Sequence, residues 1–248
     1  MIKLIASDAD GTLTEHRANA LSDGVIKGIN AAMSSGISFA VVSGRDNLSL
    51  KKLFFGVSDG VYYVSCNGAL CVKDGKALYS RPVSRETVLW AIAYAKKTET
   101  GCVFCSENSV YVYGDDAFFD KIKKMYGDGA VRVFCNRGIT DNVYKISFYR
   151  GSETGTDMGD IPFGLRMSYD RNGWTEFVNR FVNKGGAVFD LQSRLGVSAN
   201  ETAAFGDELS DADMLVKAAH RYATTDKLAE SANAVKVASA KEFFEYLK

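Results

Sequence analysis

The sequence lacks several features that mark particular classes of protein. Among its 248 residues Lys+Arg and Asp+Glu number 30 each, so the formal net charge is +0, whereas nucleic-acid-binding domains usually carry a basic excess. The longest apolar run, VLWAIAYA at 88–95, is far shorter than the roughly 18–20 residues of a membrane span. Asp8 and Asp10 lie where a signal peptide would keep an uncharged core. We therefore expect a soluble cytoplasmic protein without a nucleic-acid or membrane partner.

Histidine is scarce, and the cysteines do not form a metal-binding pattern. Cys102 and Cys105 have C-x-x-C spacing, but the chain has five cysteines, no second C-x-x-C and only two histidines, His16 and His220. A structural zinc site needs about four Cys or His ligands. We therefore interpret the cysteines as small apolar residues of a cytosolic protein and assign the two histidines no chemical role.

The start of the chain alternates between buried strands and helices. Ser22 is placed to cap a helix over 22–35, and Gly36 follows it as a helix stop. The predicted order is strand 2–7, helix 22–35, strand 37–44, helix 46–54 and strand 60–68. This alternation is typical of a parallel sheet with crossover helices.

The pattern changes after Asn67 and returns at Lys184. Asp74-Gly75 and Asn172-Gly173 indicate hairpin turns, and the strands between them are expected to pair mostly antiparallel. Helices are predicted at 84–98, 116–126, 186–195, 211–219 and 240–247, and strands at 101–106, 109–114, 131–135, 143–151, 163–169, 175–181, 201–207 and 221–225. The predicted fold is α/β: a doubly wound, Rossmann-like core of residues 1–81 and 183–248, with an α+β domain inserted at 82–182.

Polar residues gather where the predicted core strands end. They are Asp8 and Asp10, then Ser43-Gly44-Arg45, Cys66-Asn67-Gly68, and Asp207 with Ser210 and Asp211, while Lys184 precedes the returning helix. Each alone is common turn or cap chemistry. Together they would meet at one edge, because ligands of open α/β sheets bind at the carboxyl ends of the strands. Several carboxylates in one place repel each other unless a cation binds, and oxygen ligands together with a substrate phosphate suit Mg²⁺.

The spacing of Asp8 and Asp10 fits a division of labour. Residues i and i+2 of an extended chain point to the same side, so both carboxylates can face one phosphorus atom. One can attack as a nucleophile while the other handles the proton of the leaving group.

These motifs resemble the haloacid dehalogenase-like hydrolase superfamily. Residues 8–12 read DADGT, 43–45 read SGR, 184–185 read Lys-Gly and 206–211 read GDELSD, in the order of the four family motifs. The insert lies between the second and third motifs, which resembles a type II cap. The run Asn67-Gly68-Ala69 before the insert and the α/β pattern within it resemble the II-B, or Cof-type, branch. Two departures are Ser210, where the family usually has Asn, and Ala9, where a larger residue is usual; the first predicts a changed metal affinity.

The resemblance implies a role for each motif residue. Asp8 is expected to be the nucleophile and Asp10 the general acid and base. The expected Mg²⁺ ligands are Asp8, the Asp10 main-chain carbonyl, Asp207 and Asp211, and the expected phosphoryl or substrate contacts are Ser43, Gly44, Arg45, Asn67 and Lys184. Substrate choice is expected to come from the cap, where the candidates are Arg132, Arg137, Lys145, Arg150, Arg166 and, more weakly, Glu176.

The predicted function is a Mg²⁺-dependent phosphatase for a small phosphorylated metabolite, with a sugar phosphate as the expected class. A phosphomutase of the same superfamily is an open alternative. A phospho-receiver module is a further one, although an acceptor after the first strand and a large insert argue against it. A P-loop kinase is excluded because no G-x-x-x-x-G-K-[ST] occurs. The expected assembly is a monomer or a small homo-oligomer.

Overall fold

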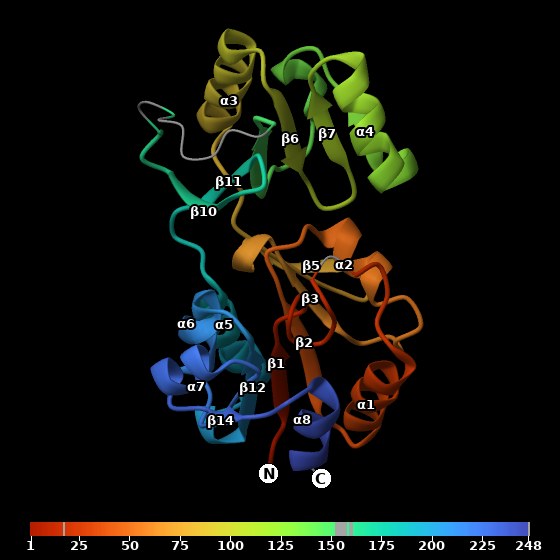
Figure 1. The fold of residues 1–248 in the computed structure, drawn as a ribbon, viewed down its shortest axis with the longest axis vertical. Coiled ribbons are helices and arrows are strands. Elements are labelled where there is room, and N and C mark those ends of the chain that lie inside the picture. The colour runs from red at the N-terminus through yellow and green to blue at the C-terminus, as the bar shows by residue number, and fades with distance from the viewer. Residues whose placement is uncertain (17, 152–157, 159–160, 248) are drawn as a thin grey trace. The chain divides into compact units, whose positions relative to one another are not determined.

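The computed structural model describes residues 1–16, 18–151, 158 and 161–247 (Figure 1). The chain divides into two compact units. The first unit comprises Met1–Arg45, Leu50–Tyr79 and Asn183–Lys248, and the second comprises Asp46–Ser49 and Ser80–Val182.

An eight-stranded sheet forms the centre of the first unit. Its strands are β1 (Leu4–Ser7), β2 (Ser38–Val42), β3 (Tyr62–Ser65), β4 (Leu70–Lys73), β5 (Lys76–Ser80), β12 (Thr202–Gly206), β13 (His220–Ala223) and β14 (Val235–Lys236), in the order β14-β13-β12-β1-β2-β3-β4-β5. The pairs from β14 to β3 are parallel, whereas β4 is antiparallel to β3. This topology places the carboxyl ends of β1, β2, β3 and β12 at one edge.

Helices cover both faces of this sheet (Figure 1). They are α1 (Asp23–Ser34), α2 (Asn47–Leu53), α5 (Lys184–Leu195), α6 (Ala212–Leu215), α7 (Asp226–Ala232) and α8 (Ala240–Tyr246). Ile5, Phe39 and Phe205 point to the layer of α1 and α8, while their neighbours Leu4 and Ala204 pack against α5, α6 and α7. Because side chains alternate along a strand and both faces are covered, every residue of β1 is buried. The predicted doubly wound α/β core is confirmed.

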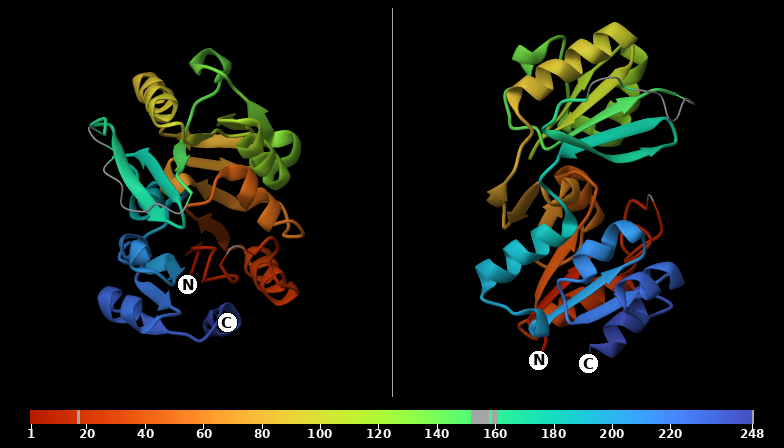
Figure 2. Two further views of the ribbon diagram at one scale, coloured as in Figure 1. Left: turned by 45° about the horizontal axis from the view of Figure 1, so that its top comes forward. Right: turned by 90° about the vertical axis from the view of Figure 1, so that its left-hand side faces the viewer.

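The described part of the second unit contains a six-stranded sheet and the helices α3 (Arg85–Thr98) and α4 (Asp116–Tyr126) (Figure 2). The strands are β6 (Gly101–Cys105), β7 (Val110–Tyr113), β8 (Ala130–Arg132), β9 (Lys145–Tyr149), β10 (Leu165–Arg171) and β11 (Trp174–Asn179). The order is β10-β11-β9-β6-β7-β8, with only β7 and β8 parallel among these pairs. Asn172 and Gly173 both have positive φ in the β10–β11 hairpin, as the Asn-Gly signal predicts.

Local sequence signals account for several helix ends. The Ser22 side chain accepts a hydrogen bond from the Val25 N–H, and Gly36 follows α1 with φ +85°. Helix α5 begins at Lys184 rather than at 186, because the Asn183 side chain caps it by accepting from the Gly186 N–H at 2.6 Å. Lys184 therefore lies on the first turn of a helix and not in a preceding loop.

Two other predictions of secondary structure were wrong, and two elements were missed. The helix predicted at 211–219 covers only Ala212–Leu215, because the Ala219 N–H turns to the carbonyl of Ala199 as the chain enters β13. The strand predicted at 131–135 spans Ala130–Arg132, after which one bond from Val133 to Val112 continues the pairing. Helix α7 and the two-residue β14 were not predicted.

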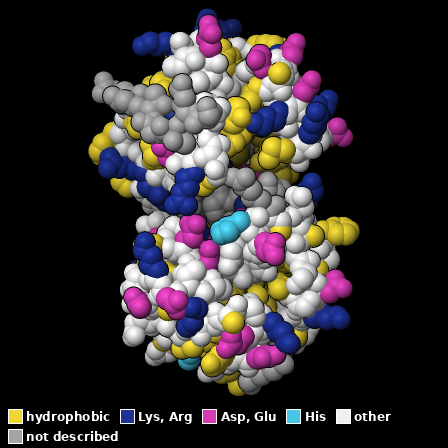
Figure 3. Space-filling view, viewed as in Figure 1, with side chains coloured by type: hydrophobic (Ala, Val, Ile, Leu, Met, Phe, Trp, Pro, Cys, Tyr) yellow, Lys and Arg dark blue, Asp and Glu magenta, His cyan; other side chains and the backbone are white. Residues whose placement is uncertain are grey.

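The described part of the chain contains no helix that is long and apolar enough to cross a membrane. On the face shown in Figure 3, acidic and basic side chains are intermixed. Cys102 and Cys105 are buried within β6, in keeping with their interpretation as apolar strand residues.

Candidate active site

The chain makes a tight turn immediately after β1. The Leu13 and Thr14 N–H groups donate to the carbonyl of Ala9, and the Gly11 N–H donates to the carbonyl of Thr14 at 2.7 Å. Gly11 has φ +79°, and a Cβ at this position would lie 2.2 Å from Asp207 Oδ2. Glycine is thus required both by the backbone conformation and by the close approach of Asp207.

Asp8 and Asp211 share the ammonium group of Lys184. Lys184 Nζ donates to Asp8 Oδ1 and to Asp211 Oδ1, each at 2.6 Å, and all three side chains are almost completely buried. The other oxygen of Asp211 accepts from the N–H groups of Asp207 and Glu208 at 3.1 and 3.2 Å. Both Asp211 oxygens therefore have partners, and its carboxylate fixes Lys184 against the turn after β12.

The pKa values of Asp8 and Lys184 are both raised, but by different causes. Burial raises the pKa of Asp8 to about 7, although Lys184 opposes the rise; Asp211 and Asp207 add to it. Burial would lower the pKa of Lys184, but the carboxylates of Asp8 and Asp211 outweigh it and hold that pKa above its usual value. One buried cation thus faces several carboxylates, which leaves an excess of negative charge.

Asp207 lies beside Asp8 and is held by a residue that sequence reasoning missed. Thr12 Oγ1 donates to Asp207 Oδ1 at 2.8 Å and lies 3.5 Å from Asp8 Oδ2. Burial raises the pKa of Asp207, while the Thr12 hydrogen bond opposes the rise. His16, which the sequence analysis set aside, has Nε2 3.8 Å from Asp207 Oδ2. The signal for Thr12 was its place within DADGT.

Asp10 takes a different partner from Asp8. Arg45 Nε and one of its terminal nitrogens, Nη2, donate to the two oxygens of Asp10, each at 2.6 Å. Arg45 Nη2 also donates to the carbonyl of Ala18 at 2.9 Å. The two aspartates of the motif are thus oriented from different sides, Asp8 by Lys184 and Asp10 by Arg45.

The ends of β2 and β3 bring together the remaining predicted residues of the first unit. Ser43 is buried, and its Oγ accepts from the Arg45 N–H at 3.2 Å. The Asn67 N–H donates to the Ser43 carbonyl, and Asn67 Oδ1 lies 3.4 Å from where a Cβ on Gly44 would be. Cys66, Asn67 and Gly68 all have positive φ, which turns the chain back against the end of β2.

The carboxylates fit a hard divalent cation. Asp8, Asp207 and Asp211 each offer an oxygen within 4.8 Å of the others, and His16, Asp207 and Glu208 form a second such group. Among the described residues the Asp10 side chain belongs to neither group, so a part for Asp10 in metal binding would fall to its main-chain carbonyl. An all-oxygen set of carboxylates is the donor chemistry that Mg²⁺ prefers.

The charged residues predicted to select the substrate lie in the second unit, where most have close partners. Lys145 on β9 pairs with Glu176 on β11 at 3.1 Å, and Ser147 Oγ donates to the same Glu176 at 3.3 Å. Other pairs are Arg132 with Asp116, Arg150 with Asp170, and Arg166 Nε with the Val182 carbonyl.

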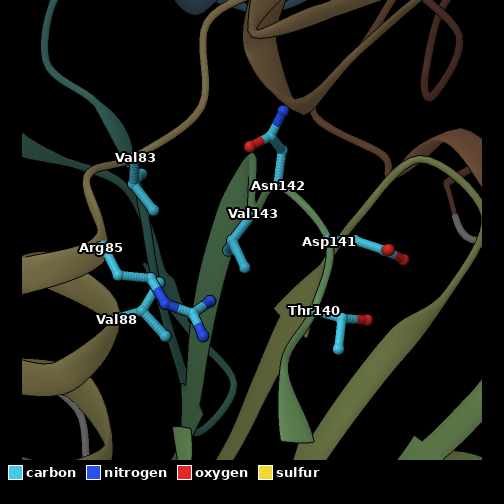
Figure 4. Close-up of a pocket in the computed structure, with 7 residues that line it drawn as sticks. All are labelled: Val83, Arg85, Val88, Thr140, Asp141, Asn142 and Val143. Atoms are coloured by element: carbon cyan, nitrogen blue, oxygen red, sulfur yellow. The ribbon is translucent and has the colours of Figure 1, made fainter. Parts of the chain in front are cut away.

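A pocket of about 260 Å³ also lies within the second unit. Figure 4 shows Asp141 and Thr140 pointing away from Arg85, whose guanidinium donates to the carbonyls of Ile139 and Asn136. The polar side chains of this pocket diverge, and none of the predicted catalytic residues lines it.

Similarity to known proteins extends over almost the whole chain. A family model for haloacid dehalogenase-like hydrolases matches residues 5–241. The 5-amino-6-(5-phospho-D-ribitylamino)uracil phosphatase YbjI of Escherichia coli (strain K12) is 25% identical over 251 residues, covering 97% of this chain and 89% of that protein.

Solved structures share the fold over nearly the whole chain. A crystal structure of a protein from Eubacterium rectale aligns with a TM-score of 0.86 at 20% identity. The alignment covers 100% of this chain and 99% of that protein's chain. A HAD subclass IIB sugar phosphatase aligns with a TM-score of 0.75 at 20% identity, covering 99% and 98%. At this level of identity, the likeness to these structures establishes the fold.

Proposed function

The chain belongs to the haloacid dehalogenase-like hydrolases, and from this membership we propose that it is a Mg²⁺-dependent phosphatase. Its substrate is a small phosphorylated metabolite, and the reaction passes through an aspartyl-phosphate on Asp8. The membership itself confirms the resemblance predicted from DADGT, SGR, Lys184-Gly185 and GDELSD. The Mg²⁺ requirement, the aspartyl-phosphate and the substrate class are what we propose beyond this membership.

The observation that carries the proposal is the buried cluster around Asp8. Three carboxylates and one ammonium group meet at the carboxyl end of the parallel sheet, with Lys184 2.6 Å from both Asp8 and Asp211. A structural ion pair would need one carboxylate, whereas this cluster keeps a surplus of negative charge out of water. Such a surplus is costly unless the site exists to bind a cation.

The side chains can perform a two-step transfer. Asp8 attacks the phosphorus, the bond to the leaving oxygen breaks, and a proton from Asp10 passes to that oxygen. Water then attacks the phosphorus, its proton returns to Asp10, and inorganic phosphate leaves with Asp8 regenerated. Ser43 and Lys184 are proposed to contact the phosphoryl oxygens, and the Lys184 charge offsets the negative charge that accumulates there.

The metal would be held by oxygens of the same cluster. Asp8 and Asp207 are the proposed carboxylate ligands, with the Asp10 carbonyl as a third, while Asp211 acts directly or through water. When bound, Mg²⁺ neutralises charge on the phosphoryl oxygens. In the structure the Asp211 oxygens already accept from Lys184 and from two backbone N–H groups, which favours the indirect role.

We place the substrate among sugar phosphates and related esters. The E. coli relative is named for a phosphoribitylamino compound, and the subclass IIB neighbour is described as a sugar phosphatase. We propose residues 82–182 as the cap that selects the leaving group. Candidate contacts in the cap are Arg132, Arg137, Lys145, Arg150, Arg166 and Glu176, and Gly44 and Asn67 are candidate contacts at the rim of the core.

A panel of phosphorylated metabolites assayed for free phosphate tests the proposal. The purified protein should release phosphate with Mg²⁺ and lose that activity in EDTA. Asp8→Asn should fold normally and lose nearly all turnover, whereas Asp23→Asn, at an exposed aspartate of α1, should match the wild type. Isomer exchange without phosphate release would identify a mutase instead. A long-lived phosphoprotein that turns over no substrate would identify a receiver, and full activity of Asp8→Asn would overturn the mechanism.

A further inference from the structure

Arg45 occupies both oxygens of the carboxylate assigned to proton transfer. Its Nε reaches Asp10 Oδ2 and its Nη2 reaches Asp10 Oδ1, each at 2.6 Å. The side chains are 18% and 26% exposed, respectively, so the pair lies at the rim of the buried cluster. A bidentate arginine–carboxylate pair fixes direction as well as distance.

Arg45 is itself held by three further hydrogen bonds. Its N–H donates to Ser43 Oγ at 3.2 Å, and its carbonyl accepts from the Cys66 N–H at 2.8 Å. Its guanidinium also donates to the Ala18 carbonyl at 2.9 Å. These bonds connect the ends of β2 and β3 to the segment that follows the Asp8–Thr14 turn. The guanidinium is therefore a fixed support against which Asp10 rests.

From this geometry we propose that Arg45 is a positioning residue for Asp10 rather than a contact for the substrate. This inference rests on the proposed function and assigns Arg45 a part in it. Asp8 is oriented by Lys184 and Thr12, whereas both carboxylate oxygens of Asp10 accept from Arg45. Loss of Arg45 removes the bidentate pair that fixes the direction of this carboxylate, and proton transfer to the leaving oxygen requires the carboxylate within hydrogen-bond reach.

The two roles for Arg45 predict different dependence on the leaving group. An alkyl phosphate needs a proton on its departing oxygen, whereas the phenolate of p-nitrophenyl phosphate leaves without one. If Arg45 positions Asp10, its loss should therefore lower kcat/KM strongly for the alkyl ester and only slightly for the aryl ester. If Arg45 bound the substrate, its loss would lower kcat/KM for both esters alike, because both present the same phosphoryl group.

The experiment compares kcat/KM, which reports the steps up to departure of the leaving group, for p-nitrophenyl phosphate and glycerol 2-phosphate. Arg45→Met should lower kcat/KM for the alkyl ester about 100-fold, the scale of general acid catalysis, and by less than about tenfold for the aryl ester. Arg45→Lys should recover only part of the loss, because an ammonium cannot reproduce the bidentate pair. Lys52→Met, which removes an exposed cation of α2, is the matched control.

A double-mutant cycle tests whether Arg45 acts through Asp10. In the Asp10→Asn background, Arg45→Met should have little further effect on the alkyl ester, because the group that Arg45 orients has been replaced. Equal losses for both esters, or additive effects of the two substitutions, would overturn the inference.

A crystal structure of Arg45→Met provides a readout independent of turnover. The Asp10 side chain should leave its wild-type rotamer or become disordered; an unchanged rotamer would refute the positioning role. If the wild type hydrolyses neither ester nor any metabolite of the panel, the proposed phosphatase function fails, while this structure still decides how Arg45 affects Asp10.

Discussion

Lys184 lies 2.6 Å from Asp8, although the two residues are 176 positions apart in the chain. The contact joins the end of the first strand to the first turn of α5. In the sequence, the second unit lies between these two elements. Both side chains are buried, and the same ammonium group reaches Asp211 at 2.6 Å. The fold thus encloses one cation among several anions, and this imbalance determines how the site responds to substitution, pH and metal.

Removal of the Lys184 charge should destabilise the metal-free protein. Lys184→Met leaves Asp8 and Asp211 without their shared cation in a buried site, and breaking such a pair costs about 3 kcal/mol or more. Urea unfolding in EDTA at neutral pH measures the loss. Lys52→Met, at an exposed position, should change the free energy of unfolding by less than about 0.5 kcal/mol. An unchanged unfolding midpoint for Lys184→Met would contradict the buried ion pair.

The metal-free protein should also lose stability as the pH rises from about 4 to about 7. The pKa of Asp8 is raised from 3.8 to about 7, chiefly by burial, so the folded state binds more protons than the unfolded state in this interval. The free energy of unfolding therefore falls with rising pH. The raised pKa of Asp207 acts in the same direction. Thermal unfolding in EDTA across this range measures the effect.

Two comparisons separate this effect from other titrations. Asp8→Asn should flatten the pH dependence, because the asparagine carries no proton to lose. Added Mg²⁺ should raise the melting temperature of the wild type more at about pH 8 than at about pH 5, since protons compete for the same oxygens. A melting temperature that rises from about pH 5 to about pH 7 in EDTA would contradict the sign of the prediction.

The sequence was sufficient to predict the edge of the sheet at which the carboxylate cluster lies. Buried strands that end in Asp8, Ser43 and Asp207 must deliver these residues to one edge, because parallel strands share their direction. Long periodic helices such as α4 were also predictable. Helix α7 and β14 were missed; β14 has only two residues, which is too short for a periodic pattern to stand out.

The partners of each side chain could not be predicted in the same way. Arg45 and Asp10 are 35 residues apart, and Thr12 and Asp207 are 195 apart. Their pairing depends on side-chain direction at the sheet edge, which strand order alone leaves open. The motif therefore identified Arg45 as a candidate substrate contact, whereas in the structure its guanidinium engages Asp10. The start of α5 depended on the Asn183 cap, which moved Lys184 into the helix.

Gly11→Ala should impair the site beyond its cost to the backbone. Gly11 has φ +79°, and an added Cβ would lie 2.2 Å from Asp207 Oδ2. Gly36→Ala is a matched control, because Gly36 has φ +85° with no atom within 4 Å of an added Cβ. Both variants should lose about 1–2 kcal/mol of stability to the left-handed conformation. Only Gly11→Ala should also raise the Mg²⁺ concentration needed for half-maximal activity; equal effects of the two substitutions on that concentration would contradict the close approach.

Thr12 should tune the metal affinity of the site through Asp207. Its hydroxyl donates to Asp207 Oδ1 at 2.8 Å, which fixes the carboxylate in one orientation. Thr12→Val keeps the side-chain shape but removes the donor, so a buried oxygen loses its partner at a cost of about 1–3 kcal/mol. Loss of such a supporting hydrogen bond typically weakens metal binding about tenfold or more. Titration of phosphatase activity with Mg²⁺ should therefore show a shifted midpoint with a nearly unchanged maximum rate at saturation.

Thr12→Ser is the control that separates the hydroxyl from the methyl group. It retains the donor to Asp207 and should keep the Mg²⁺ midpoint within about threefold of the wild type, while the lost methyl group costs about 1 kcal/mol of stability. The two variants should therefore change different quantities. Thr12→Val should shift the Mg²⁺ midpoint and keep the packing of the side chain, whereas Thr12→Ser should keep the midpoint and lose packing. An unshifted midpoint for Thr12→Val would mean that Asp207 is oriented without Thr12, and that the missed threonine has only a structural part in the turn.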